Sequence, residues 1–591
     1  MIGKSKLTIE IGVDMPTKKA GLKTLATTTT DPSVIPAAAP SRNGTVRMVL
    51  SNSVGDNPLA EPQSVAGNGA ARGGANAYGA FSIETFADAG SLMSTHEDAG
   101  GFLGYVGKFT APNFWYKDGN VQIWSYYEDF DDWQDTYGMD AVNVAYHSGH
   151  GGRRADGSVW FPLGGNWNNQ GTNAWAGTMR LGNERANYLF WSTCFACPVY
   201  APLNPIITWK SANLGFRMLF GFETVSLDDG NYGKYFFEEW NKGKSFSTAW
   251  MDASWRISHG QVPSVVACGA TQAEATDRLN NERLFNFGHV SKNWWQWRWY
   301  YASSLAPTNL GTRERQFAVP ADLRGAQLRP VEVDPKLLRS TVDRFGLRVS
   351  IPREVPVSAT GALRIGDGDS QLAYGPDGSI EAQLANHNYA NRDQIPVSQA
   401  AAIAQEALGL YGLTRDAELV FDKVQYAAEA GGSAQGDGEL LDPVVTGTTV
   451  QFKQIINGLP VITPGAGEVR VSVDNDGKVT RVASSVRAVD RLTRAVGGGG
   501  PTPTPDGAEQ PAAVGADQDP VEQRLGASWA QYLARWATKG QMPIGYSLVP
   551  GTTEVGYAMQ HDQAVVVATR EIEVDFGNGL LKRYRIEAPL G

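Results

Sequence analysis

Two apolar stretches in the first half of the chain predict buried strands that end in chemically reactive side chains. Residues 141–146 alternate with the two-residue period of a strand, and the run stops at a glycine-rich segment that contains His150. Residues 186–191 form a second apolar run, which leads into Cys194. Glycine reaches backbone conformations that other residues avoid, so the chain can turn sharply after the first strand and approach a substrate closely. The pattern therefore predicts an imidazole and a thiol at the ends of two strands.

Strand-like and helical stretches continue on both sides of this region. A strand is expected at residues 78–84 and a helix at 87–101, and residues 140–255 alternate between the two element types. Such alternation is typical of an α/β sandwich with a mostly parallel sheet, in which right-handed crossovers bring the carboxyl ends of the strands to one edge. Open sheets of this kind bind ligands at that edge. We therefore expect His150 and Cys194 to lie there.

The later part of the chain has a different pattern, with strands separated by turn signals. Ser398 can cap an alanine-rich helix that extends to Leu410. The Asn-Gly and Asp-Gly pairs in this part of the chain are typical of hairpin turns. Strands are expected at residues 449–455, 469–473 and 479–485. A last helix is expected at 521–538, and a hairpin at 564–588. This mixture predicts an α+β accessory region after the α/β sandwich.

Length and composition divide the chain into regions. A chain of 591 residues is too long for one compact core. Segments rich in Thr, Ala, Gly and Pro bury little apolar area and are expected to be flexible. The predicted regions are a disordered or flexible arm at 1–75, an α/β domain at 76–305, a linker at 306–335, an α+β domain at 336–492, a Gly/Pro linker at 493–520, and a helix with a β-hairpin at 521–591.

Charge and hydropathy limit the partners of the protein. The chain has 51 basic and 61 acidic residues, a net charge of −10, which gives no indication of a nucleic-acid binder. It has no apolar run of the length that spans a membrane and no recognisable signal peptide, so cytoplasmic synthesis is expected, with export by another route left open. The three cysteines do not suggest a disulfide framework.

The histidine and the cysteine at the two strand ends suit nucleophilic catalysis. A nearby imidazole favours the thiolate of a cysteine, which is the form that attacks a carbonyl carbon. His150 and Cys194 are therefore the candidate catalytic pair, and a protein or peptide is the expected substrate.

These motifs resemble those of the caspase-like (clan CD) cysteine peptidases, which include caspases, metacaspases, gingipains, legumains and the bacterial CHAT proteases. The likeness covers roughly residues 79–270. Its motifs are Tyr146 to Gly152, Ser192-Thr193-Cys194, Gly215 to Phe222, Asp228-Asp229, and Gly243-Lys244-Ser245 before a helix. The resemblance implies a caspase-like α/β/α sandwich and a peptidase that works through an acyl-enzyme. It also implies that the backbone of Gly151 contributes to the oxyanion hole.

The expected substrate pocket departs from the metacaspase pattern. Metacaspases carry an acidic residue two positions before the nucleophile, where this chain has Ser192. Asp228 and Asp229 are candidates to replace that residue, although an exposed acidic turn explains them equally well. The preference for a basic residue therefore does not transfer to this chain.

Two other functions remain open at this point. His147, His150, Cys194 and Cys197 supply two imidazoles and two thiols, a ligand set suited to tetrahedral zinc or to redox chemistry. A degenerate peptidase fold could instead serve as a binding or adhesion protein without catalysis. The hypothesis of a cysteine peptidase requires no cofactor.

Calcium is a further possible ligand of the chain. Five carboxylates fall in one short segment, at Glu128, Asp129, Asp131, Asp132 and Asp135. Calcium takes several oxygen ligands, but the spacing does not match a known calcium loop. A solvated acidic turn is the simpler interpretation.

The region after the α/β domain resembles the prodomains of secreted metalloproteases and the related PepSY modules. The resemblance rests on Ile456 to Val461 and Val471 to Val479. In those families the modules act as inhibitors or folding assistants. The resemblance therefore implies that the carboxyl-terminal part of the chain regulates the site.

Overall fold

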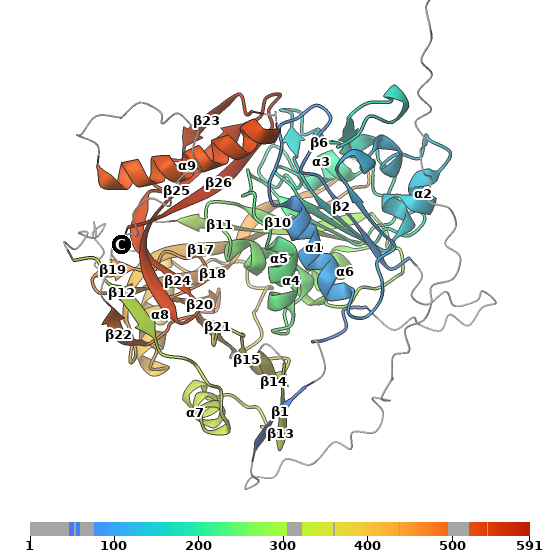
Figure 1. The fold of residues 1–591 in the computed structure, drawn as a ribbon. Helices are drawn as coiled ribbons and strands as arrows, with labels where there is room; N and C mark the ends of the chain where they lie inside the picture. Colours follow the sequence, from blue (N-terminus) through green and yellow to red (C-terminus); the bar gives the residue numbers. More distant parts are fainter. Residues whose placement is uncertain are drawn as a thin grey trace, which may run out of the picture.

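The computed structural model describes residues 46–51, 55–59, 76–303, 322–358, 361–436, 438–493, 519–539 and 542–590. These residues form a mixed α/β structure around one sheet of fifteen strands (Figure 1). We call its first part the parallel half, because five parallel strands precede two antiparallel ones. In spatial order its strands are β3 (Phe114–Lys117), β2 (Tyr78–Ser82), β4 (Val144–Ser148), β8 (Tyr188–Ser192), β9 (Met218–Phe222), β10 (Pro263–Gly269) and β11 (Trp294–Ser303).

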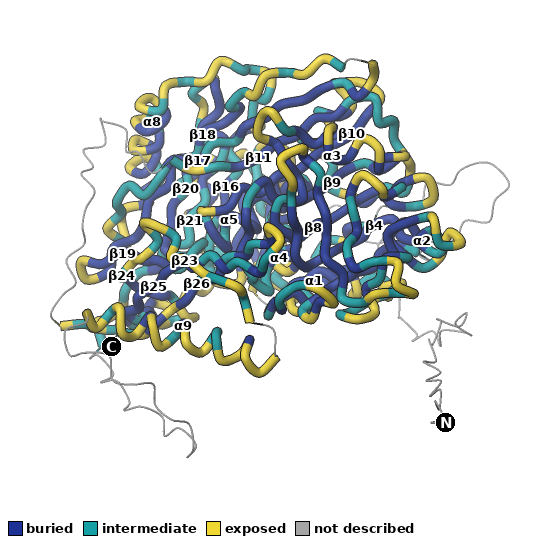
Figure 2. The backbone as a smooth tube through the Cα atoms, turned by 90° about the horizontal axis from the view of Figure 1, so that it is seen from above, coloured by how far each residue is buried: buried dark blue, intermediate teal, exposed yellow. Residues whose placement is uncertain are grey.

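The two predicted apolar strands form β4 and β8, which lie side by side in the parallel half. They are parallel and in register, so Ser148 lies opposite Ser192. Every residue of both strands is buried, because structure covers both faces of the sheet. Figure 2 shows both strands in the dark blue that marks buried residues. The register brings the segments that follow the two strands to the same edge of the sheet.

Helices cover one face of the parallel half, and a small sheet with a short helix lies on the other. Figure 1 shows the covering helices grouped together, and their apolar residues form one buried cluster with that face of the sheet. They are α1 (Thr95–Val106), α4 (Tyr232–Trp240), α5 (Phe246–Trp255) and α6 (Gln272–Asn281). The opposite face packs against β5 (Gly152–Arg153), β6 (Val159–Pro162), β7 (Asn173–Trp175) and α3 (Pro205–Trp209).

The predicted helix at residues 87–101 is wrong in its first half. Residues 87–94 form a loop, and α1 begins at Thr95. The loop is held by backbone hydrogen bonds from Ala87 to Leu163 and from Leu92 to Glu84, which replace the bonds of a helix. This loop carries Gly90 past the candidate site.

The predicted α+β region continues the same sheet, and we call it the antiparallel half. Its first strand, β17 (Glu418–Ser433), pairs with β11 along the whole length of β11. The remaining strands are β18 (Leu440–Ile456), β19 (Leu459–Pro460), β20 (Glu468–Asp474), β21 (Val479–Ser484), β16 (Ile380–Gln383), β15 (Ser370–Tyr374) and β14 (Leu363–Asp367). The expected strands at 449–455, 469–473 and 479–485 are confirmed within this set.

Helix α8 (Val397–Leu410) lies against the strands of the antiparallel half. The helix was predicted, but Ser398 does not cap it. Pro396 occupies the N-cap position, and Ser398 lies inside the first turn of the helix. The predicted Asn-Gly turn is confirmed between β18 and β19, where Asn457 and Gly458 both have positive φ.

A second, six-stranded sheet contains the end of the chain. Its strands are β22 (Val489–Thr493), β12 (Gly325–Leu328), β25 (Gln563–Asp575), β23 (Gly545–Leu548), β24 (Glu554–Gln560) and β26 (Leu581–Pro589). Helix α9 (Pro520–Lys539) lies on β25 and β26 (Figure 1). The predicted hairpin at 564–588 is confirmed as β25 and β26. Part of the predicted linker at 306–335 is instead strand β12, because Ala326 and Leu328 are buried against residues of this sheet.

Part of the predicted flexible arm at residues 1–75 is also ordered. Residues of β1 (Arg47–Leu50) pair in parallel with β13 (Glu354–Val357). Val46 is buried in the apolar cluster of the antiparallel half, which explains why the chain is held there. The rest of the predicted arm lies outside the described residues, apart from residues 51 and 55–59. Most of the predicted linker at 493–520 lies outside them as well.

The remaining described helices are short or peripheral. They are α2 (Trp133–Tyr137), α7 (Pro335–Phe345), and the single turns η2 (Asp118–Asn120), η3 (Ile123–Ser125), η4 (Met139–Ala141), η5 (Trp167–Asn169) and η6 (Ala176–Thr178). Within the described parts of the chain, no helix is both long enough and apolar enough to cross a membrane.

Candidate functional site

His150 lies two residues beyond the end of β4, and its imidazole is completely buried. Its Nε2 lies 3.0 Å from the carbonyl oxygen of Gly90. Because a carbonyl only accepts hydrogen bonds, Nε2 carries the proton of the neutral ring and Nδ1 is left as an acceptor. Nδ1 has no hydrogen-bond partner among the described residues. Aromatic rings flank the imidazole, with the centroids of Phe86 and Phe576 both 4.8 Å away.

Burial keeps this imidazole neutral. Desolvation, and secondarily the positive charge of Lys582, lower the pKa of His150 to about 3. The ring is therefore neutral in this buried conformation, with Nδ1 as its unprotonated nitrogen.

Cys194 follows β8 by two residues, and its side chain is also completely buried. Its Sγ donates to the carbonyl oxygen of Leu581, 3.1 Å away, and accepts from the backbone N–H of Ser226 at 3.3 Å. The hydroxyl of Ser226 lies 3.5 Å from the same sulfur. The thiol therefore points at the carboxyl-terminal strand β26 and is not hydrogen-bonded to His150.

Two backbone features fix the turn that holds the thiol. Phe195 has φ of 60°, a left-handed conformation that is uncommon for a bulky residue. Strain of this kind clusters at functional sites. A Cβ on Gly151 would lie 2.2 Å from the carbonyl oxygen of Cys194, so only glycine fits where the histidine loop meets the cysteine turn. The two predicted loops are thus in direct contact through their backbones.

Lys582 on β26 connects the surroundings of both side chains. Its Nζ donates to Oγ of Ser226 at 3.0 Å, the same hydroxyl that approaches the Cys194 sulfur. Its charge also acts on His150 and on Asp228. The lysine side chain is itself buried. A cation therefore sits beside the candidate base, the thiol and an acidic residue.

The three predicted pocket residues have different positions. The carboxylate of Asp228 accepts from the backbone N–H of Met93 at 2.8 Å and is close to Lys582. Burial raises the pKa of Asp228, and the charge of Lys582 opposes that shift. Asp229 accepts from the backbone N–H of Asn231 in its own turn. Of the two acidic candidates, Asp228 is the one that interacts with Lys582.

Ser192, the third pocket candidate, is buried at the end of β8. Its side chain bonds to Asp98 of α1, which also accepts from the hydroxyls of Tyr146 and Ser148 at 2.6 and 2.7 Å. Burial raises the pKa of Asp98 to about 6, against the effect of these hydrogen bonds. This hydroxyl and carboxyl network fixes the ends of β4 and β8 from the helix-covered face.

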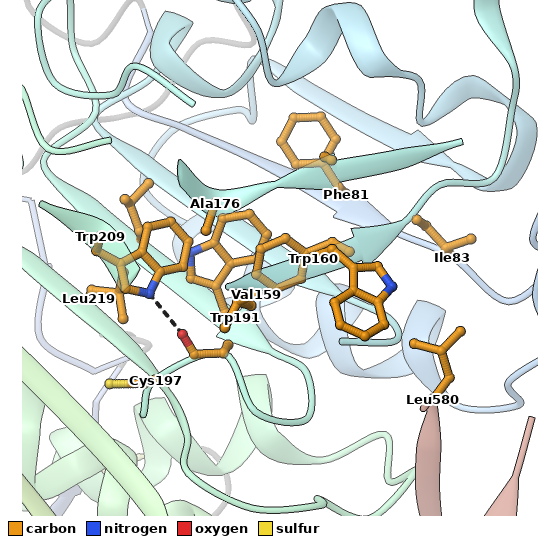
Figure 3. Packing of buried hydrophobic residues seen from close by; sticks show 14 of the residues in the cluster. Phe81, Ile83, Val159, Trp160, Ala176, Trp191, Cys197, Trp209, Leu219 and Leu580 are labelled. Carbon is orange, nitrogen blue, oxygen red and sulfur yellow. Dashed lines mark hydrogen bonds between the residues drawn. The ribbon is translucent and has the colours of Figure 1, made fainter. Parts of the chain in front are cut away.

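The four residues of the alternative zinc set are in different environments. The hydroxyl of Tyr126 lies 2.8 Å from Nδ1 of His147, whose pKa burial lowers to about 3. Cys197 is buried among apolar side chains such as Trp209 and Leu219 (Figure 3), and burial raises its pKa to about 12. Within the described residues, no group of three or more His, Cys, Asp or Glu side chains is arranged to hold a metal ion.

That statement also covers the acidic segment around Asp131. Asp131 and Asp132 have positive φ and form a tight turn before α2. Burial and the neighbouring carboxylates Asp140, Glu128, Glu184 and Asp132 raise the pKa of Asp135 to about 7. These features fit an acidic turn, and calcium remains a sequence-based expectation.

Three contributors to the site were missed by sequence reasoning: Gly90, Asp98 and Lys582. Gly90 acts through its carbonyl group, which any residue carries, so no sequence signal marks it. Asp98 lies in the confirmed part of the predicted helix, and its contacts with the distant strands β4 and β8 have no local sequence signal. Lys582 could have been found, because it occupies an inward-facing position of a strand in which Tyr584 and Ile586 share its face. A lysine on the buried face of a strand needs a partner.

One family comparison finds a match. A family model described as a domain of unknown function (DUF6345) matches residues 80–303. The matched region runs from β2 to β11 and contains both His150 and Cys194. It therefore coincides with the parallel half of the sheet. A search of curated proteins finds no match to the chain.

Proposed function

We propose that this protein is a cysteine peptidase of the caspase-like type, with Cys194 as the nucleophile and His150 as its base. The observation that carries the proposal is the register of β4 and β8, which places the histidine loop and the cysteine turn at one edge of a parallel sheet. Contact between Gly151 and the backbone of Cys194 supports it. The buried neutral imidazole, oriented by the carbonyl of Gly90, supports it further.

In the proposed reaction, Nδ1 of His150 takes the proton of the Cys194 thiol as the sulfur attacks the carbonyl carbon of a peptide bond. The C–N bond then breaks, and the proton passes from the imidazolium to the departing amine. A water molecule, deprotonated by the same imidazole, then attacks the thioester carbon. The C–S bond breaks, the acid product leaves, and the proton returns from the imidazolium to the Cys194 sulfur. These two stages, formation and hydrolysis of the acyl-enzyme, replace one difficult step with two easier ones. No cofactor takes part.

The oxyanion of each tetrahedral intermediate needs preorganised donors. The backbone of the histidine loop at Gly151 is the proposed source, because it lies against the cysteine turn. Such donors commonly contribute about 3–4 kcal/mol of transition-state stabilisation. Asp228 is the proposed acidic group of the substrate pocket, since it is the acidic candidate that interacts with the buried Lys582.

The described conformation is a closed form of the proposed enzyme. Neither His150 nor Cys194 has any exposed surface, so a substrate cannot reach them until part of the cover moves. The same filled site also suits the alternative of a binding protein without catalysis. An experiment that measures thiol reactivity and peptide cleavage separately distinguishes these two functions.

The test is labelling of the full-length protein with a thiol-reactive peptide electrophile at neutral pH, located by mass spectrometry. A peptide library is assayed in parallel for cleavage. We expect selective modification of Cys194, loss of both modification and cleavage in His150→Ala, and loss of cleavage in Cys194→Ala. Cys197→Ala is the matched control and should retain both, because Cys197 lies in the apolar core.

Other results would overturn the proposal. Labelling of Cys194 that requires a zinc chelator would indicate a metal site. Labelling of Cys194 without peptide cleavage, both in the wild type and in variants that expose the buried site, would favour a binding protein.

A further inference from the structure

The strand β26 enters the candidate site as an added strand. The backbone N–H of Asp228 donates to the carbonyl of Arg583 at 2.9 Å, and the N–H of Arg583 donates to the carbonyl of Ser226 at 3.2 Å. These bonds form a parallel bridge between Leu227 and Arg583. Addition of an extended chain to a free backbone edge is a common way of binding peptides. Here the added chain belongs to the protein itself.

The same strand takes the hydrogen bond that catalysis needs. The Cys194 thiol donates to the carbonyl of Leu581 at 3.1 Å, while Nδ1 of His150 has no partner among the described residues. The thiol hydrogen is therefore donated to the strand and not to Nδ1 of His150. The carbonyl oxygen of Leu581 occupies the position in front of the sulfur that the carbonyl carbon of a substrate would need.

The side chains of the hairpin fill the space around the pair. Lys582 is 3% exposed and donates to Ser226 at 3.0 Å, next to Asp228. The hydroxyl of Tyr584 interacts electrostatically with Asp228. Phe576, beside the turn between β25 and β26, contacts the His150 ring. Backbone, charged and aromatic groups of one hairpin thus converge on the two side chains.

The hairpin is anchored from behind by α9. The indole N–H of Trp536 donates to the carbonyl of Ser91, 2.9 Å away, in the loop that carries Gly90. The Trp536 ring also packs edge-on against Tyr584, with centroids 5.1 Å apart. This anchor lies outside the catalytic pair, so it can be weakened without altering the pair.

We infer that the β25–β26 hairpin is a built-in inhibitor that occupies the substrate cleft of the proposed peptidase and must leave before an extended peptide can bind. The inference rests on the proposed function. It differs from the expectation for the prodomain-like region at 336–492, because the segment in contact with the site comes from the end of the chain. A substrate competes with the hairpin. Its apparent affinity is therefore its intrinsic affinity multiplied by the fraction of molecules in which the hairpin is displaced.

The test compares the labelling rate of Cys194 by iodoacetamide in the full-length protein with that in Lys582→Glu. The substitution places a carboxylate beside Asp228 and removes the hydrogen bond to Ser226. We expect labelling at least tenfold faster. Lys478→Glu is the matched control, because it makes the same charge change at an exposed turn of the antiparallel half, and its labelling rate should equal that of the wild type.

Two further variants guard against a general loss of folding. Lys582→Met keeps a side chain of similar length and removes its charge and its hydrogen bond to Ser226 without adding a carboxylate, and Trp536→Phe removes the hydrogen bond to Ser91. Each should increase Cys194 labelling by a smaller factor, while Cys197 stays unlabelled because the core is intact. Equal labelling of both cysteines would reveal unfolding. Unchanged labelling of Cys194 in the folded Lys582→Met and Trp536→Phe variants would overturn the inference.

Peptide cleavage separates this inference from the proposed function. Faster labelling together with faster cleavage supports both. Faster labelling with no cleavage keeps the hairpin as a cover of the thiol but removes the peptidase, and with it the inhibitory role. Cleavage that is equally fast in the wild type and in all hairpin variants keeps the peptidase and overturns the inhibitor.

Discussion

The two halves of the large sheet belong to one continuous hydrogen-bonded ladder, but they differ in strand direction and strand length. In the parallel half, strands are short, buried on both faces, and end at one edge where loops bring His150 and Cys194 together. In the antiparallel half, β17 and β18 are long strands joined by a hairpin, and their paired ends offer no such edge. Parallel strands need long crossovers, and those crossovers leave room for a site. The comparison explains why the candidate site lies in the first half.

The halves are also joined electrostatically behind the sheet. Lys244 pairs with Glu239 and Asp252 of the parallel half and with Glu381 of the antiparallel half. Arg470 and Arg481, from β20 and β21, reach Asp252. A second buried pair, Arg298 with Glu429, links β11 to β17. The boundary between the halves is therefore a buried interface.

Acid should separate the two halves most strongly. His147 and His150 have folded pKa values of about 3, against about 6.5 when unfolded. Their contribution to stability is fully present above pH 6.5 and is lost as pH falls toward 3, by about 1.4 kcal/mol per pH unit for each ring. The raised pKa values of Asp98 and Asp135, about 6 and about 7, favour the folded parallel half as pH falls and offset part of this loss. In the antiparallel half, burial lowers the pKa of His387, but it raises that of Glu468 to about 7, and this second effect favours the folded state as pH falls.

We therefore expect the parallel half to lose structure first between pH 6 and 4. Tryptophan fluorescence reports on this half and on α9, because no tryptophan occurs between residues 300 and 528. Hydrogen exchange of residues 380–484 reports on the other half. His561→Gln, at an exposed histidine, is the control and should leave both profiles unchanged. Loss of both halves at the same pH would contradict the expectation.

Breaking the ion network should be the next largest effect. Lys244→Met leaves Glu239, Asp252 and Glu381 without their shared cation, and removal of one partner from a buried network costs about 3–5 kcal/mol. Urea unfolding followed by fluorescence and by circular dichroism measures the loss and shows whether the two halves then unfold separately. Lys478→Met, at an exposed site, should change stability by less than about 0.5 kcal/mol. A loss below about 1 kcal/mol for Lys244→Met would show that the network contributes little.

The smallest expected effect tests whether the halves unfold together. Gly104 in α1 and Gly409 in α8 have no atoms within 4 Å of the position of an added Cβ. Replacement of each by Ala should stabilise the protein by about 0.5–1 kcal/mol. In a single cooperative unit the two gains add at one urea midpoint, whereas independent halves shift separately. Gly101→Ala is the control on α1 and should destabilise, because its Cβ would lie 2.8 Å from the backbone nitrogen of Lys234.

The sequence predicted the local elements of the site better than its surroundings. The alternation before His150 and the apolar run before Cys194 identified β4 and β8, because buried strands have a strong local pattern. The Asn457-Gly458 turn was predicted for a similar reason, since its chemistry is local. The start of α1 was misplaced because tertiary backbone contacts hold residues 87–94 as a loop.

Contacts between distant residues had no local signal. Leu581 meets Cys194, Arg583 meets Leu227, and β12 joins the carboxyl-terminal sheet, yet each pair is separated by more than two hundred residues. The sequence also contains no sign that the expected accessory domain continues the large sheet, because β11 could not be assigned a partner from its own sequence. The caspase-like relationship and the peptidase activity remain predictions.

The position of β26 in the chain has a consequence for protein synthesis. Residues up to β11 leave the ribosome before residue 581 is made, and about 280 residues separate the two points. At about 5–20 residues per second, translation of that interval takes about 15–55 s. During this time the nascent parallel half has its histidine and its cysteine but not the strand that covers them. A newly made chain therefore passes through an uncovered state once, before its own last strand arrives.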